Sequence, residues 1–256
     1  METKESKVVE PELSGFDQAV KARKLDIVRD MLLYKTGFMS WSSVRLAAEN
    51  RDIDMLKLFA EQDNLVSAFK IAIENNEFAF LVELTRITKR KSKLVVCDAI
   101  KQGNLEFVKF LHLNGFDMME SITTALEFNK RAILDYLLSA NINCSYTVYP
   151  ICAAIRSRNL EMVKYAITRE KDMKSLGIGD TLDTALEIGA FDIAEFLIAN
   201  GHKSRGPYES IKQDNMEVYD WVMKKRLYDP EEMKDAIMKY SAFCPKIYKR
   251  VFGGNL

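Results

Sequence analysis

The sequence predicts an all-α solenoid built from short helix–turn–helix repeats. First, the chain of 256 residues contains only 11 Gly and 5 Pro, which suits helices with short connections better than a sheet-rich fold. Second, a small residue recurs at intervals of 25 to 31 residues. Third, two apolar stripes at helical spacing keep the same register, and 48% of the chain is apolar, so an extended core can be buried.

The recurring small residue, called the anchor below, is expected in the first helix of each repeat. An apolar residue stands one position after it in every repeat and three positions before it in all but the last, which has Pro207, and these offsets share one face of a helix. The anchors are Ala19, Ala47, Ala72, Ala99, Ala125, Ala154, Ala185 and Ser210. A small side chain here allows neighbouring helices to approach closely.

The second stripe lies eight, nine and twelve residues after each anchor and predicts a second helix. Between the two helices stand Gly or polar residues, as in Gln102-Gly103-Asn104 and Asn75-Asn76, which suit a helix end. One such pair cannot bury its apolar faces alone, so we expect the pairs to stack. A non-repetitive bundle would also show helical spacing, but it has no reason to keep eight columns in register.

The register divides the chain into three parts. Residues 1–13, METKESKVVEPEL, are expected to form a flexible tail, and their charge is unlike a secretory signal. Residues 14–226 are expected to hold eight repeats. A ninth anchor falls at Ala236, but Pro245 lies where its second helix should be. Residues 227–256 are therefore expected to be a divergent capping unit that shields the last apolar face.

The charge balance and the cysteine content limit the classes of function that the chain can have. Lys plus Arg and Asp plus Glu number 37 each, and this balance argues against a nucleic-acid binder or a membrane-surface protein. No run of about 18 apolar residues predicts a membrane span. Four scattered cysteines predict free thiols in an intracellular, cytoplasmic protein. The basic run at 86–93, RITKRKSK, would serve as a nuclear import signal or an anionic contact, or more simply as a solvated loop.

Two segments resemble the ankyrin repeat, whose consensus runs roughly T-P-L-H-x-A-A-x-x-G-H-L-E-V-V-K-L-L-L-x-x-G-A-D. They are 99–117, AIKQGNLEFVKFLHLNGFD, and 185–201, ALEIGAFDIAEFLIANG, and Pro150 holds the proline position of T-P-L-H. By register, the resemblance extends over 14–226. It implies an ankyrin-like scaffold for protein–protein interaction.

The chain departs from that family in its period, because ankyrin units repeat about every 33 residues. The missing residues fall between units, so the β-hairpin fingers that the family projects there are expected to be short or absent. That loss would remove part of the family's usual binding surface. Short arrays of this kind resemble those encoded by large DNA viruses and by some intracellular parasites.

The position two residues after the anchor is charged in all eight repeats, and in ankyrin folds it faces the concave groove. A ladder of mixed charge there would select a complementary partner protein. The simpler interpretation is ordinary solvated surface. The residues are Lys21, Glu49, Glu74, Lys101, Glu127, Arg156, Glu187 and Lys212, four of each sign, which does not suit a nucleic-acid groove.

Bulky aromatic residues near the start of the first helices are candidate binding hot spots, because Trp and Tyr dominate interface energies. They are Trp41, Tyr146, Tyr149 and Tyr208. The alternative is that each packs adjacent repeats together.

Catalysis has little support in the sequence. It contains two histidines, His112 and His202, no zinc-type Cys or His spacing, no phosphate-binding glycine loop and no nucleophile elbow. We therefore expect no enzyme activity, no metal and no cofactor; an enzyme on a helical scaffold is the remote alternative.

The C-terminal segment supports a second alternative. Residues 230–240, PEEMKDAIMKY, resemble the opening helix of an F-box, with Pro230, Glu232, Met233, Ile237 and Tyr240 on the pattern. The resemblance implies a substrate adaptor that recruits a ubiquitin ligase. The first expectation remains a scaffold that binds an unidentified partner protein through the concave face of its first helices and its inter-repeat loops.

Overall fold

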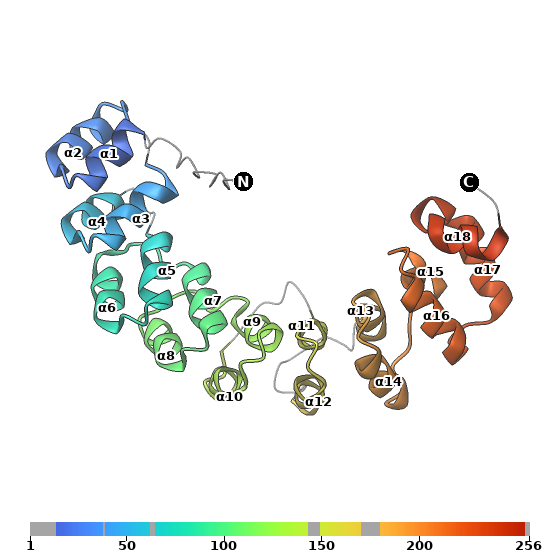
Figure 1. The fold of residues 1–256 in the computed structure, drawn as a ribbon. Coiled ribbons are helices and arrows are strands. Elements are labelled where there is room, and N and C mark those ends of the chain that lie inside the picture. The colour runs from blue at the N-terminus through green and yellow to red at the C-terminus, as the bar shows by residue number, and fades with distance from the viewer. Residues whose placement is uncertain (1–13, 38, 62–64, 143–148, 170–179, 254–256) are drawn as a thin grey trace, which may run out of the picture. The chain divides into compact units, whose positions relative to one another are not determined.

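The computed structural model describes residues 14–37, 39–61, 65–142, 149–169 and 180–253. Within these ranges the chain forms eighteen α-helices and one short 3-10 helix, and no strand (Figure 1). The predicted all-α class is confirmed. The expected tail at 1–13 lies outside the described residues. Among the described helices, none combines the length and the apolar character that crossing a membrane requires.

The chain divides into two compact units, residues 1–117 (the N-terminal unit) and 118–256 (the C-terminal unit). The helices of the N-terminal unit are α1 (Gly15–Lys21), α2 (Leu25–Leu33), α3 (Trp41–Glu49), α4 (Ile53–Ala60), α5 (Val66–Glu74), α6 (Phe78–Ile87), α7 (Lys93–Gln102) and α8 (Leu105–Leu113). Those of the C-terminal unit are α9 (Ser121–Glu127), α10 (Arg131–Ser139), α11 (Pro150–Arg156), α12 (Leu160–Thr168), α13 (Thr181–Glu187), α14 (Phe191–Ala199), α15 (Pro207–Ile211), α16 (Met216–Lys225), α17 (Pro230–Lys239), η1 (Ser241–Phe243) and α18 (Pro245–Phe252).

Each helix contacts chiefly the other helix of its own pair and the equivalent helix of the next pair. In the N-terminal unit α1, α3, α5 and α7 pack in sequence as one row, and α2, α4 and α6 contact one another in turn (Figure 1). In the C-terminal unit α9, α11, α13, α15 and α17 form the corresponding row. Each unit is thus a stack of helix pairs, as the helix–turn–helix spacing predicts.

The anchors lie in the interior of these stacks. All eight are buried, and the seven alanines and Ser210 are between 0% and 8% exposed. Each lies in the first-helix row, where larger side chains would separate the packed helices. The small anchor residue therefore allows consecutive first helices to pack closely, as expected from the sequence.

The turn inside each pair has one repeated backbone geometry. Four residues after every anchor the backbone is left-handed, at Arg23, Arg51, Asn76, Gly103, Asn129, Arg158, Gly189 and Asp214. In six pairs the next residue donates its N–H to the anchor's carbonyl, as Asn104 does to Ala99 at 3.1 Å. This hydrogen bond closes the first helix and satisfies a carbonyl that its last turn would leave unpaired.

Local sequence also sets where helices begin. Asp52, Asn104, Asn159 and Asn215 stand five residues after their anchors, and each caps a second helix with its side-chain oxygen. Pro150, Pro207, Pro230 and Pro245 lie in the first turns of α11, α15, α17 and α18. A first-turn proline is tolerated because its missing N–H would have no partner within the helix.

The last unit departs from the register of the other eight, because α18 begins nine residues after Ala236 instead of six and Tyr240 is not left-handed. A second helix does form, and Pro245 begins it, packing α18 against α16 and α17. The carboxylate of Asp214 accepts hydrogen bonds from the N–H groups of Lys246 (3.0 Å) and Ile247 (3.1 Å). Proline would break the interior of a helix, but at position 245 it is the first residue of one. Asp214 of the preceding helix pair accepts hydrogen bonds from N–H groups in its first turn.

Candidate protein-binding surface

The column of charged residues lies at the C-terminal ends of the first helices. Seven of its members are exposed and Lys212 is half-buried. Four are glutamates that end their helices, namely Glu49, Glu74, Glu127 and Glu187. A carboxylate at a helix C-terminus is unfavourable by about 0.3–1 kcal/mol, because it meets the negative end of the helix dipole.

Several of these charges are paired within their own helix. Glu49 accepts a hydrogen bond from Arg45 at 2.8 Å, and Glu74 lies 3.7 Å from Lys70. Lys101 lies 3.7 Å from Asp98, and Lys212 lies 2.7 Å from Glu209. Exposed pairs of this kind contribute little to stability, because solvent screens their charges. The pairing suits a solvated surface, and it also offsets the cost of Glu49 and Glu74 to their helices.

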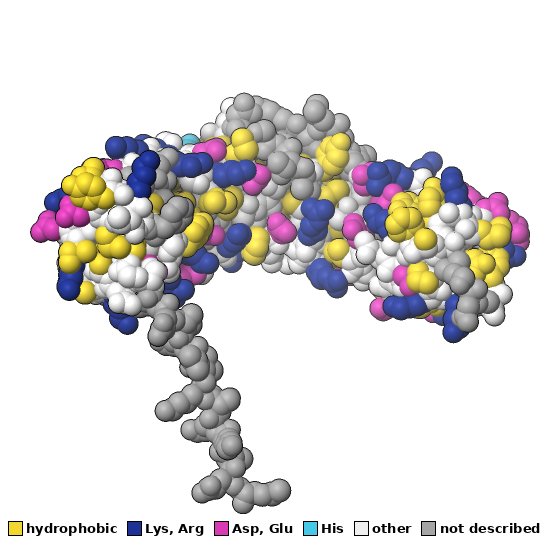
Figure 2. Space-filling view, turned by 90° about the horizontal axis from the view of Figure 1, so that it is seen from above, with side chains coloured by type: hydrophobic (Ala, Val, Ile, Leu, Met, Phe, Trp, Pro, Cys, Tyr) yellow, Lys and Arg dark blue, Asp and Glu magenta, His cyan; other side chains and the backbone are white. Residues whose placement is uncertain are grey.

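The charges of neighbouring helices also act on one another. The pKa of Arg45 is raised, first by its hydrogen bond with Glu49 and then by that residue's charge, and Glu74 of the adjacent α5 adds to the effect. Arg45 and Glu49 on α3 therefore share one electrostatic surface with Glu74 on α5. Figure 2 shows cationic and anionic side chains interspersed over the face it draws, without a field of one sign.

Exposed apolar side chains recur at the start of the first helices within each unit, and we call those of one unit its apolar lip. In the N-terminal unit these are Trp41 (59% exposed) and Leu94 (49%), and in the C-terminal unit Met119 (37%) and Tyr149 (46%). All stand five or six residues before their anchors. The sequence singled out Trp41 and Tyr149 but missed Leu94 and Met119, which their shared register position would have revealed. Tyr146 lies outside the described residues.

Tyr208 has a packing role instead. Its ring centroid lies 4.3 Å from that of Tyr240 and 6.4 Å from that of Phe243. These contacts join α15 to the last helix pair, so the packing alternative describes this residue best.

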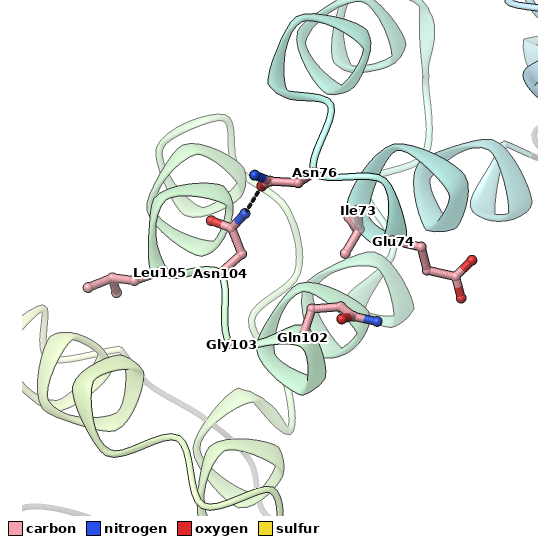
Figure 3. A pocket seen from close by; sticks show the side chains of 7 residues that line it. All are labelled: Ile73, Glu74, Asn76, Gln102, Gly103, Asn104 and Leu105. Carbon is pink, nitrogen blue, oxygen red and sulfur yellow. Dashed lines mark hydrogen bonds between the residues drawn. The ribbon is translucent and has the colours of Figure 1, made fainter.

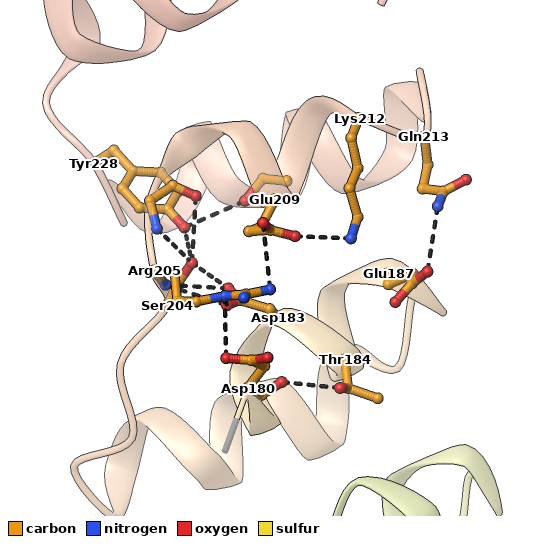
Figure 4. Close-up of polar contacts among 12 residues, drawn as sticks. Asp180, Asp183, Thr184, Glu187, Ser204, Arg205, Glu209, Lys212, Gln213 and Tyr228 are labelled. Carbon is orange, nitrogen blue, oxygen red and sulfur yellow. Dashed lines mark hydrogen bonds and ion pairs between the residues drawn. The ribbon is translucent and has the colours of Figure 1, made fainter. Parts of the chain in front are cut away.

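A buried carboxylate in the C-terminal unit is the centre of a polar network (Figure 4). Asp183 is 3% exposed and accepts hydrogen bonds from the Ser204 hydroxyl and from the backbone and side chain of Arg205. Arg205 also lies 3.0 Å from Asp180 and 3.3 Å from Glu209. The network ties α13 to the segment that leads into α15. Because the central carboxylate is covered, it stabilises the stack and does not face a substrate.

Two open pockets lie in the N-terminal unit. The larger, of about 380 Å³, is lined by residues of two successive turns, where the Asn104 amide donates to the Asn76 side-chain oxygen at 2.7 Å (Figure 3). Its walls are Ile73, Glu74, Asn76, Gln102, Gly103, Asn104 and Leu105, which include no nucleophile beside a base. The second, of about 320 Å³, is lined by Leu25, Arg29, Asp54, Lys57, Leu58 and Glu61.

Within the described ranges no three His, Cys, Asp or Glu side chains are grouped to hold a metal ion. Cys97, Cys152 and Cys244 are buried and free of disulfides. Burial raises the pKa of the Cys152 and Cys244 thiols, which disfavours the reactive thiolate.

The residues of the F-box-like segment contribute to packing. Met233 is 1% exposed and Ile237 is fully buried, and the tilted ring of Tyr240 packs against that of Tyr208. On α17 and η1 the large exposed hydrophobic side chains are Met238 (53%) and Phe243 (58%). Most of the pattern is thus used to hold the last pair onto the stack.

Comparison with models of known protein families gave no match, and comparison with curated proteins gave none. The resemblance to the ankyrin repeat therefore depends on the residues and their register.

Proposed function

We propose that this protein is an ankyrin-like scaffold that binds a partner protein through the exposed face of its first helices and its inter-repeat loops, and that it is not an enzyme. The observation that carries the proposal is the apolar lip. Trp41 and Leu94 remain about half exposed on helices whose opposite faces are fully buried. Trp is among the residues most enriched in binding hot spots.

The lip and the charged column share one helical face. On α3, Trp41, Arg45 and Glu49 are spaced four residues apart and so lie along one side of the helix. On α7, Leu94 and Lys101 are seven residues apart, about 10 Å along the axis. Each helix thus presents an apolar group at one end and a charge at the other, which suits a partner with the complementary arrangement.

The four glutamates that end first helices support the same proposal. The helix dipole favours none of the four, and an ion pair within the helix offsets that cost at Glu49 and Glu74. Selection by a partner's positive charge would explain their recurrence. The ankyrin-like class is supported by the resemblance of segments 99–117 and 185–201 to the consensus and by the left-handed turn four residues after every anchor. The buried free thiols suit a reducing compartment inside the cell.

The test is affinity purification of the full chain from its native cell, compared with a Trp41→Ser/Leu94→Ser variant. The matched control is Ile198→Ser, which changes an exposed apolar residue on the second helix α14. Loss of a partner from the first variant alone supports the proposal. Equal recovery from all three chains would place binding elsewhere and contradict it.

The same experiment decides the ubiquitin-ligase alternative. Removal of residues 227–256 would uncover Tyr208 and the faces of α15 and α16, so point substitutions are the better probe. Met238→Ser/Phe243→Ser changes two exposed side chains and leaves the buried Met233 and Ile237 in place. If ligase subunits are recovered with the natural chain and lost only from this variant, the adaptor function replaces the scaffold.

A further inference from the structure

The connection between α6 and α7 concentrates positive charge. Residues 86–93 contain Arg86, Lys89, Arg90, Lys91 and Lys93 and no acidic residue. The first four are exposed and Lys93 is half-buried. In a chain whose charges balance, five cations in eight residues are a local excess that needs a physical explanation.

Hydrogen bonds hold this connection in place. The Lys91 carbonyl accepts from the Asp117 N–H at 3.0 Å, and the Lys91 ammonium donates to the Asn114 carbonyl. Thr88 bonds the Arg90 carbonyl at 3.1 Å, and Ser92 caps α7. The connection is thereby attached to the rest of the N-terminal unit. It presents its cations from a defined position on the N-terminal unit.

Two exposed leucines lie beside the cations. Leu94 follows the connection directly and is 49% exposed. Leu113, the last residue of α8, is 81% exposed and precedes the Asn114 that Lys91 contacts. Together, residues 86–94 and Leu113 form what we call the basic–leucine surface. The neighbouring acidic residues include Glu83, three residues before Arg86 on α6, and Asp117, whose N–H bonds the connection, so the five cations remain in excess of them.

We propose that the basic–leucine surface binds an acidic linear segment of a protein that also carries apolar side chains. The inference rests on the proposed binding function and names the chemistry of one partner. The carboxylates would face the cations, which steer association, and an apolar side chain would cover Leu94 and Leu113. Nucleic acid fits less well, because the surface offers leucines where bases would need aromatic stacking partners.

The experiment measures fluorescence anisotropy of a labelled peptide in which Glu and Leu alternate, titrated with the full chain at low and at physiological ionic strength. The comparison probes are the same peptide with Lys in place of Glu, single-stranded DNA, and vesicles containing phosphatidylserine. The variants are Lys89→Glu/Arg90→Glu and, separately, Leu113→Ser. The control is Lys24→Glu/Lys203→Glu, which makes the same change in net charge at two other exposed positions.

The acidic peptide should bind, and more weakly at higher ionic strength, because exposed charges are screened. We expect the double charge reversal to weaken binding about tenfold and Leu113→Ser to weaken it severalfold. The control should bind as the natural chain does. An equal loss in the control, no binding of the acidic peptide, or tighter binding of DNA or vesicles would each overturn the proposal. If it fails while Trp41→Ser/Leu94→Ser still loses the native partner, the scaffold function stands without it.

Discussion

The side-chain nitrogen Nε of Arg205 lies 3.1 Å from Oδ2 of Asp183, a carboxylate that is only 3% exposed. The corresponding position of the first repeat, two residues before the anchor, holds Asp17, which accepts hydrogen bonds from Ser43 (2.5 Å) and Ser42 (3.1 Å). In both places a buried acid of one helix pair binds donors from the next. Polar groups therefore join successive pairs alongside the apolar core.

Replacement of Asp183 by Ala should destabilise the C-terminal unit by about 2–3 kcal/mol, because a buried carboxylate loses charged and backbone donors that then lack a partner. Arg205→Ala should lower the free energy of unfolding by no more than about 1 kcal/mol, since this side chain is 57% exposed and its ion pairs are screened by solvent. Urea denaturation followed by circular dichroism measures both. Equal losses in the two variants would contradict the central role of the carboxylate.

The left-handed turn gives a prediction that depends on backbone alone. Gly189 has φ +66°, and a Cβ placed there would meet no other atom within 4 Å. Gly189→Ala should therefore lower the free energy of unfolding by about 1–2 kcal/mol through backbone strain and not through collision. Gly15, on α1, is equally uncrowded and has no left-handed φ, so Gly15→Ala is the matched control.

Thermal melting of the two glycine variants separates the causes. Gly15→Ala should be neutral or raise the melting temperature, because Ala is the better helix former. A loss of stability in both variants would mean that added bulk, and not the sign of φ, is what these sites reject.

The same turns show what could and could not be predicted from the sequence. The pairing of helices could be predicted from the anchors, the apolar stripes and Gly103, because residues that are buried on one face of a helix recur with a regular spacing. The left-handed backbone at Arg23, Arg51 and Arg158 could not be predicted, because arginine has no preference for it. The packing of the two helices of each pair imposes it instead. Asp17 and Asp183 were missed because acids are rarely buried unless they are paired, and their partners come from the next pair.

The binding surface could be predicted only in part. The recurring charge predicted the charged column, and the aromatic side chain predicted Trp41 as a contact residue. Leu94 was overlooked because an apolar residue within a repeat is ordinarily taken as core, and only its exposure distinguishes it. A proline at position 245 predicts the end of a helix when it falls in the helix interior. The structure places it at the first residue of α18, where Asp214 accepts hydrogen bonds from Lys246 and Ile247, and the sequence alone does not reveal that contact.

Alkaline pH should weaken the C-terminal unit through Tyr228. Burial raises the pKa of this phenol, and its hydrogen bonds with Ser204 and Ser210 oppose the shift in part. A folded-state pKa above the unfolded value of about 10 means that the neutral phenol is favoured by folding. Its contribution is complete below the unfolded pKa and is lost as pH rises through the folded pKa. The charge on Lys212 acts in the same direction, because its hydrogen bond with Glu209 raises that pKa also.

Phenolate absorbance during a pH titration measures this directly. The difference between the natural chain and Tyr228→Phe should show one tyrosine ionising above about pH 10, together with the loss of helical signal. Ionisation of that tyrosine at or below the ordinary value, in a chain that remains folded, would contradict burial as the dominant effect.

Trp41 and Tyr208 were equal candidates in the sequence, and the structure separates them. Trp41 is 59% exposed at the start of α3, whereas Tyr208 is half-buried against Tyr240 and Phe243. Tyr208→Ala should lower the free energy of unfolding by about 2 kcal/mol, because it removes two aromatic contacts and leaves a gap between α15 and the last helix pair. Trp41→Ala should stay within about 0.5 kcal/mol of the natural chain, as exposed substitutions usually do. Urea denaturation of the two variants gives both values, and a large loss for Trp41→Ala would show that this residue packs repeats together, which would remove the apolar lip as the support for binding.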